Sequence, residues 1–156
     1  MADIPFAGAN HPGPLPTAST TSFTLRTAAV TDIWRKPGPP EISTFNAPII
    51  YKSIKLSSFK RARVTISAAW DTLYDQGGVL FALPKEGDVK EGKWIKTGIE
   101  FYDGEPFVGT VAKDRWADWS LTPVGIQDMG SGRKGVTLEV RCIFQAAFPV
   151  IFCDGK

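Results

Sequence analysis

The chain has 156 residues, of which 43% are hydrophobic and 12% aromatic, and this is enough to build the core of one domain. The formal net charge of +2, from 18 basic and 16 acidic residues, is too balanced for a protein whose main task is to bind a nucleic-acid backbone. No apolar run approaches the roughly 20 residues that cross a bilayer. We therefore expect one soluble domain that binds neither nucleic acid nor a membrane.

The N-terminal residues 1–22 contain four prolines and several turn-forming residues, and they predict a flexible arm ahead of a single domain over residues 23–156. The first residues lack the basic and apolar regions of a signal peptide, which predicts an intracellular, cytoplasmic protein. The single histidine, His11, and the two cysteines, Cys142 and Cys153, do not have metal-ligand spacing. We expect no metal, no cofactor and no disulfide framework, with Cys142 a small core residue.

From Phe23 onward, short runs of β-branched and aromatic residues alternate with turn clusters, and no run has helical periodicity. This pattern predicts an all-β, antiparallel two-sheet β-sandwich. The Asp103-Gly104 pair favours a tight hairpin turn between two of the strands. The expected strands cover residues 22–29, 49–56, 62–70, 78–83, 94–102, 107–112, 119–123 and 136–144.

Residues 94–101 have the clearest functional pattern in the chain. On a β-strand their side chains alternate between an apolar face, which predicts core, and a mixed face with an aromatic ring, a cation, a glycine and a carboxylate. A folding protein has no reason to bury such a mixed row, so it predicts a ligand site. Pairing across the hairpin places Gly109 beside the row, and we expect a groove there. The row consists of Trp94, Lys96, Gly98 and Glu100.

Four segments of the chain resemble, in the same order, a widespread family of uncharacterised proteins that contains the yeast regulator-of-enolase protein. The match spans roughly residues 23–140. That family is similar in fold to the concanavalin-A-like lectins and glucanases, so the resemblance implies a two-sheet jelly roll whose concave sheet binds or cleaves sugars. The matching segments are residues 32–35, 74–78, 94–101 and 118–120.

The chain departs from the family after Arg141, where further strands usually follow but here only a few residues remain. One interpretation is an unpaired edge that pairs with a second copy of the chain, giving a homodimer. The alternative is a simple C-terminal strand that completes one sheet. The candidates for a contact are Phe148, Ile151 and Phe152.

The leading functional hypothesis is a lectin-like module that binds a carbohydrate or related small ligand through Trp94, Lys96 and Glu100. Trp116 and Trp119 are further candidates for stacking on a ligand, and for each tryptophan the alternative is burial in the core. A regulatory or structural partner protein is a third class.

The runner-up is a small enzyme, an isomerase, cyclase or hydrolase, in which Glu100 carries the proton and Lys96 is its electrostatic partner. Sugar hydrolysis would require a second carboxyl group near Glu100. The chain offers Asp71, Asp75, Asp103 and Asp118 for that role.

Tyr74, Asp75 and Gln76 come just before a glycine pair where the backbone can turn sharply, and they are candidates for contacting a ligand from the rim. Asp75 has the competing role of capping the turn. Arg35 could clamp a ligand carboxylate, although an ion pair that locks its strand is the favoured interpretation. The basic run at residues 60–63 is interpreted as a solvated edge strand.

Overall fold

The computed structural model describes residues 4–17, 19–123, 125–141, 143–145 and 148–150. The chain divides into two compact units, Met1–Phe59 and Lys60–Lys156, which we call the N-terminal unit and the C-terminal unit. The expected division into an arm over residues 1–22 and one domain over residues 23–156 stays a prediction.

The N-terminal unit consists of two short antiparallel strand pairs joined by irregular segments. Strand β1 (Ala7–Ala9) pairs with β4 (Ile49–Tyr51), and β2 (Ile33–Lys36) pairs with β3 (Ile42–Phe45). Part of the expected arm is therefore a strand. A 3-10 turn, η1 (Leu56–Ser58), follows β4.

The prediction of a strand over residues 22–29 is wrong, because the structure shows no strand there. Threonine hydroxyls supply the physical reason. The Thr27 hydroxyl bonds the Ala28 carbonyl at 3.1 Å and the Thr31 hydroxyl at 2.7 Å. Such local side-chain bonds compete with a sheet ladder.

Arg35 forms the expected ion pair within the β2–β3 hairpin. Its Nη2 lies 2.9 Å from Glu41 Oε1, and its Nε donates to the same oxygen at 3.1 Å. The guanidinium thus joins the strand to the turn that follows it, as the favoured interpretation predicted.

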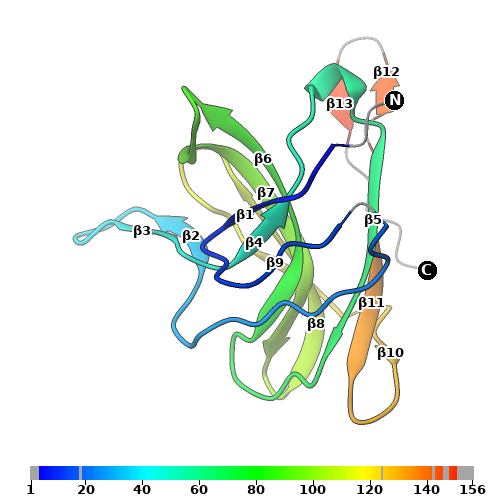
Figure 1. Cartoon of the computed structure of the whole chain (residues 1–156). Helices are drawn as coiled ribbons and strands as arrows, with labels where there is room; N and C mark the ends of the chain where they lie inside the picture. The colour runs from blue at the N-terminus through cyan, green and yellow to red at the C-terminus, as the bar shows by residue number, and fades with distance from the viewer. Residues whose placement is uncertain (1–3, 18, 124, 142, 146–147, 151–156) are drawn as a thin grey trace. The chain divides into compact units, whose positions relative to one another are not determined.

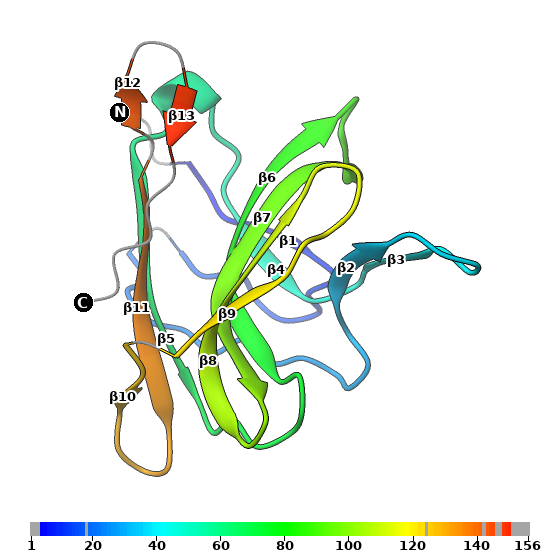
Figure 2. The same ribbon diagram turned by 180° about the vertical axis from the view of Figure 1, so that it is seen from behind.

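The C-terminal unit is built around two antiparallel sheets (Figure 1 and Figure 2). The four-stranded sheet has the order β6 (Gln76–Lys85), β7 (Asp88–Tyr102), β8 (Glu105–Lys113) and β9 (Ser120–Thr122). The three-stranded sheet has the order β10 (Gln127–Asp128), β11 (Lys134–Arg141) and β5 (Arg61–Ala68). A separate pair joins β12 (Ile143–Gln145) to β13 (Phe148–Val150).

The hydrophobic core lies between these two sheets. Ile99 of β7 is 1% exposed and packs with Val136 and Leu138 of β11. The cluster also includes half-buried side chains from both sheets, namely Val64, Ile66, Val79 and Val108. The apolar face predicted for residues 94–101 is therefore the core face, and the predicted all-β, antiparallel two-sheet sandwich is confirmed.

The hairpin between β7 and β8 has the turn that its sequence predicts. Tyr102 pairs with Glu105, which leaves Asp103 and Gly104 as the two central turn residues. Their φ angles are 50° and 79°, and a primed two-residue turn requires positive φ at both positions. This turn fixes the register of β8 against β7.

Strand β5 lies at the edge of the three-stranded sheet, as expected for the basic run. Arg61, Arg63 and Thr65 are exposed, and the alternating residues Ala62, Val64 and Ile66 are half-buried. Arg61 Nη1 lies 4.0 Å from Glu139 Oε2 on the paired strand. The basic run thus faces solvent on an edge strand, which discourages edge-to-edge pairing.

Within the described ranges, no helix has the length and apolar character that would allow it to cross a bilayer. The expected contact residues Ile151 and Phe152, and both cysteines, lie outside the described residues. Phe148 belongs to β13. The proposed homodimer edge therefore stays a prediction.

Candidate functional site

The mixed face of β7 extends across the neighbouring strands, because directly paired residues of an antiparallel ladder point to the same side. Glu100 pairs with Gln76 of β6 and with Phe107 of β8. One row along, Gly98 pairs with a glycine on each side, Gly78 and Gly109. Backbone atoms of the paired strand occupy the position where a Cβ at Gly98 would lie, so this glycine serves close strand approach and leaves no gap for a ligand.

Glu100 is the charged residue at the centre of the candidate site, and it is only 9% exposed. The indole Nε1 of Trp119 donates to Glu100 Oε2 at 2.9 Å. A Cβ at Gly109 would lie 3.0 Å from the same oxygen and 3.4 Å from Leu121 Cδ2. The space over Gly109 is therefore filled by the Glu100 carboxylate and Leu121, and the groove expected at this position is absent.

Three aromatic rings gather beside Glu100. The Tyr102 and Trp119 ring centroids are 5.4 Å apart in an edge-to-face arrangement, and Tyr74 lies 6.1 Å from Tyr102 and 6.5 Å from Trp119. Tyr74 is 52% exposed and Trp119 is 42% exposed, so both present ring surface to solvent. We call Tyr74, Glu100, Tyr102 and Trp119 the carboxylate–aromatic cluster.

The turn before β6 holds Tyr74 in place. Tyr74 has a φ of 67°, which is uncommon for a residue other than glycine. Its backbone N–H donates to Phe101 O at 2.8 Å. Asp75 Oδ2 accepts from the N–H groups of Thr72 at 3.1 Å and Asp71 at 3.4 Å. Asp75 therefore caps the turn, which was its competing role.

Lys96 and Gln76 bind each other rather than Glu100. Lys96 Nζ donates to Gln76 Oε1 at 2.7 Å. Among the described residues, the neutral indole N–H of Trp119 is the donor that reaches Glu100, and no cation forms an ion pair with it. Lys96, expected to flank a ligand with Glu100, thus binds Gln76, expected to contact a ligand from the rim.

Trp94 lies at the other end of the same face and is 4% exposed, so its ring has no free surface on which a ligand could stack. The structure favours burial, the alternative for this residue. Its ladder partner Lys113 is 3% exposed and donates through Nζ to Gly92 O at 2.6 Å and Lys90 O at 3.1 Å.

Trp116 and two of the candidate second carboxyl groups do not join the cluster through any contact in the described chain. Arg115 lies with its guanidinium carbon 5.4 Å from the Trp116 ring centroid. Asp118 Oδ1 accepts the backbone N–H of Ala112 at 2.8 Å, and Asp75 is the turn cap described above. These two carboxylates therefore hold the backbone.

Tyr102 was not among the sequence-predicted site residues. The alternation of side chains along β7 could have identified it, because Tyr102 follows Glu100 by two positions and shares its face. No group of three or more His, Cys, Asp or Glu side chains in the described ranges is arranged to hold a metal ion.

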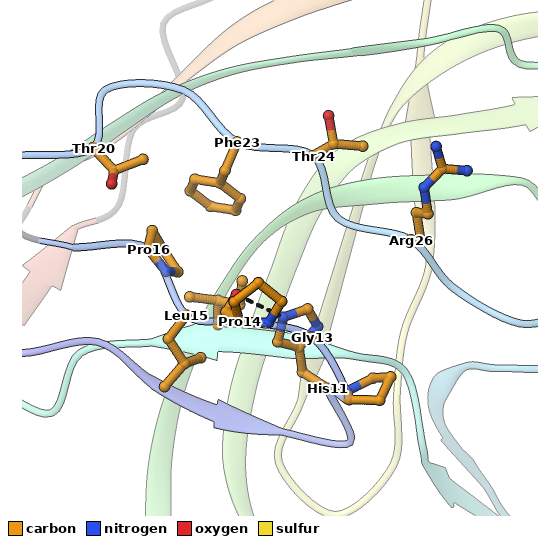
Figure 3. A pocket seen from close by; sticks show the side chains of 11 residues that line it. His11, Gly13, Pro14, Leu15, Pro16, Thr20, Phe23, Thr24 and Arg26 are labelled. Atoms are coloured by element: carbon orange, nitrogen blue, oxygen red, sulfur yellow. Dashed lines mark hydrogen bonds between the residues drawn. The ribbon is translucent and has the colours of Figure 1, made fainter.

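The N-terminal unit contains a separate pocket of about 530 Å³ (Figure 3). Residues 11–16 and parts of residues 20–26, together with Ile50, line it. His11 Nε2 lies 3.4 Å from Pro14 O. His11 Nδ1 is buried with no partner in the described chain. None of the predicted ligand-binding residues lines this pocket.

Two curated relatives match the chain over much of its length. It is 55% identical over 118 residues to the uncharacterized protein AN7484 of Emericella nidulans, an alignment that covers 76% of this chain and 54% of that protein. It is 29% identical over 104 residues to Regulation of enolase protein 1 of Saccharomyces cerevisiae, which covers 65% of this chain and 47% of that protein. The chain thus spans about half the length of these relatives.

No solved structure matches the chain. The match to the yeast protein bears out the predicted relationship to its family. The DUF1349 family, described as "Protein of unknown function (DUF1349)", matches residues 9–148, and the chain therefore belongs to this family.

Proposed function

We propose that the protein is a lectin-like binding module that holds a carbohydrate or a related small ligand at the carboxylate–aromatic cluster. The observation that carries this proposal is the hydrogen bond from Trp119 to Glu100, which joins an exposed ring to an almost buried carboxylate. Sugar ligands present an apolar ring face together with hydroxyl donors. Aromatic surfaces and carboxylate oxygens complement these two features.

The cluster is also organised before any ligand arrives. Trp119 fixes one carboxylate oxygen of Glu100, and the capped turn fixes the backbone at Tyr74. Oxygen Oε1 of Glu100 has no protein donor among the described residues, so it can accept a hydrogen bond from a ligand. Such preorganisation reduces the entropy lost on binding. The proposed site therefore keeps the candidates Glu100, Tyr74 and Trp119 and leaves out the buried Trp94.

A thermal-shift screen against soluble glycans and sugar acids tests this proposal. A ligand at about 100 times its dissociation constant adds roughly 2.7 kcal/mol to the free energy of unfolding. We expect Trp119→Ala to abolish the shift. Trp116→Ala is the matched control and should retain it, because Trp116 makes no ring contact with the cluster in the described chain. A shift that survives Trp119→Ala would place the ligand elsewhere.

Glu100→Gln separates the binding module from the alternative enzyme. The substitution keeps the shape of the side chain and its ability to accept from Trp119, but it removes proton transfer. Retained binding with lost turnover would favour the enzyme. A glycan ligand that binds the wild-type chain without being converted would favour the module. If no ligand in the library raises the melting temperature, the result would favour a partner-protein role.

A further inference from the structure

We infer that the carboxylate–aromatic cluster selects ligands that carry a positively charged ammonium group, and that among carbohydrates it prefers amino sugars. This inference rests on the proposed function and names the ligand class of the same site. It draws on two independent features, the unbalanced charge of Glu100 and the arrangement of the rings.

Glu100 is a nearly buried carboxylate with no counter-ion among the described residues. It is 9% exposed, and the donor that reaches it is the neutral N–H of Trp119. The nearby cation Lys96 is bonded to Gln76 at 2.7 Å. Buried charges in proteins are normally paired, because burial without a partner costs free energy. A ligand cation would supply the missing partner.

The three rings favour the same kind of ligand. The face of an aromatic ring has negative potential, and a cation within about 6 Å of the ring centroid is attracted to it, most strongly by tryptophan. Tyr74, Tyr102 and Trp119 lie within 6.5 Å of one another, and Trp119 uses its N–H edge for Glu100. Trp119 is also 42% exposed, so part of its surface is open to a ligand.

The selection is local and does not follow from the overall charge. The whole chain has a formal net charge of +2, which weakly repels cations at long range. An ammonium group that donates to Glu100 Oε1 while it lies against the exposed rings would satisfy the charge and use the aromatic surface together. A neutral hydroxyl at the same place would satisfy only the hydrogen bond.

Isothermal titration with four probes tests the inference, namely glucosamine, N-acetylglucosamine, glucose and tetramethylammonium. The titrations are run at constant ionic strength and at mildly acidic pH, where the amine of glucosamine is protonated. An ammonium group adds the attraction of opposite charges to the hydrogen bond that a hydroxyl also makes with a carboxylate, and this predicts roughly tenfold tighter binding of glucosamine than of either neutral sugar. We expect Glu100→Gln to remove that preference, so that glucosamine binds no more tightly than the neutral sugars.

Asp114→Asn is the matched control, because this exposed carboxylate pairs with Lys93 at 2.9 Å and takes no part in the cluster. The control should keep the preference, and the melting temperature of each variant verifies that it folds. Equal affinity for glucosamine and glucose would overturn the inference and leave the proposed function standing.

Two further outcomes separate the two proposals. In one outcome, glucosamine and tetramethylammonium bind, their binding requires Glu100, and neither neutral sugar binds. This result would support cation selection and contradict a general carbohydrate module. Absence of binding by all four probes would overturn cation selection at the cluster, and the glycan screen then decides the proposed function on its own.

Discussion

The two ends of the mixed face of β7 bury charged side chains in different ways. At one end, Lys113 is 3% exposed and donates to two backbone carbonyls, those of Lys90 and Gly92. At the other end, Glu100 is 9% exposed and has one neutral donor, Trp119, whose ring is 42% exposed. The first charge is satisfied by the chain itself and is structural. The second has one neutral donor and lies beside exposed aromatic residues, and for this reason we propose the binding site at this end.

The largest expected effect is at the structural end. Trp94→Ala removes a ring that is 4% exposed and should lower the free energy of unfolding by about 3–5 kcal/mol. Chemical unfolding followed by circular dichroism measures this, with Trp94→Phe as a milder variant. A loss below about 1 kcal/mol, within the range of surface substitutions, would show that Trp94 is not a packing residue.

Lys113→Met should have the next largest effect, because it leaves the carbonyls of Lys90 and Gly92 without this donor. Unsatisfied buried acceptors predict a loss of about 1–3 kcal/mol in the free energy of unfolding. The exposed Lys93→Met is the control and should change stability by no more than about 0.5 kcal/mol. Equal effects of the two substitutions would contradict a structural role for Lys113.

Gly109→Ala tests how closely the site end is packed. The new Cβ would lie 3.0 Å from Glu100 Oε2, the oxygen that accepts from Trp119, so the carboxylate must move by a few tenths of an ångström. Overpacking of this kind predicts a loss of about 1–3 kcal/mol together with weaker glucosamine binding. If the variant binds as tightly as the wild-type chain, the position of the carboxylate does not matter for the ligand.

Trp119→Phe should give the smallest change in stability at the site end. It keeps an aromatic ring and removes the N–H that fixes Glu100. One hydrogen bond predicts a change of about 1 kcal/mol in the free energy of unfolding, whereas glucosamine affinity should fall roughly fivefold or more. Unfolding curves and titrations on the same sample compare the two quantities. Unchanged glucosamine affinity in this variant would show that the Trp119–Glu100 hydrogen bond does not contribute to ligand binding.

Local sequence patterns predicted the core face and the main hairpin of the sandwich. Alternation along residues 94–101 identified Ile99 as core, and the Asp103-Gly104 pair identified the turn, because both depend on neighbouring positions alone. The strand expected over residues 22–29 failed because threonine hydroxyls there bond locally, which a count of β-branched residues does not detect.

The members of the carboxylate–aromatic cluster were predicted in part, whereas their role as a site stays a prediction. Glu100, Tyr74 and Trp119 were all among the candidates, but their association was not, because it depends on the register of β7, β8 and β9. The burial of Trp94 likewise depends on tertiary packing that strand alternation cannot reveal. Alternation assigns a side chain to a face, whereas only the packing of that face decides between core and site.

The most direct test of the account is an NMR titration that follows the indole N–H signals of the five tryptophans as glucosamine is added. Substitution of each tryptophan by phenylalanine in turn assigns the signals. We expect the Trp119 signal to shift as glucosamine is added and the Trp94 signal to stay in place. A shift at Trp94 with none at Trp119 would contradict the assignment of the two ends.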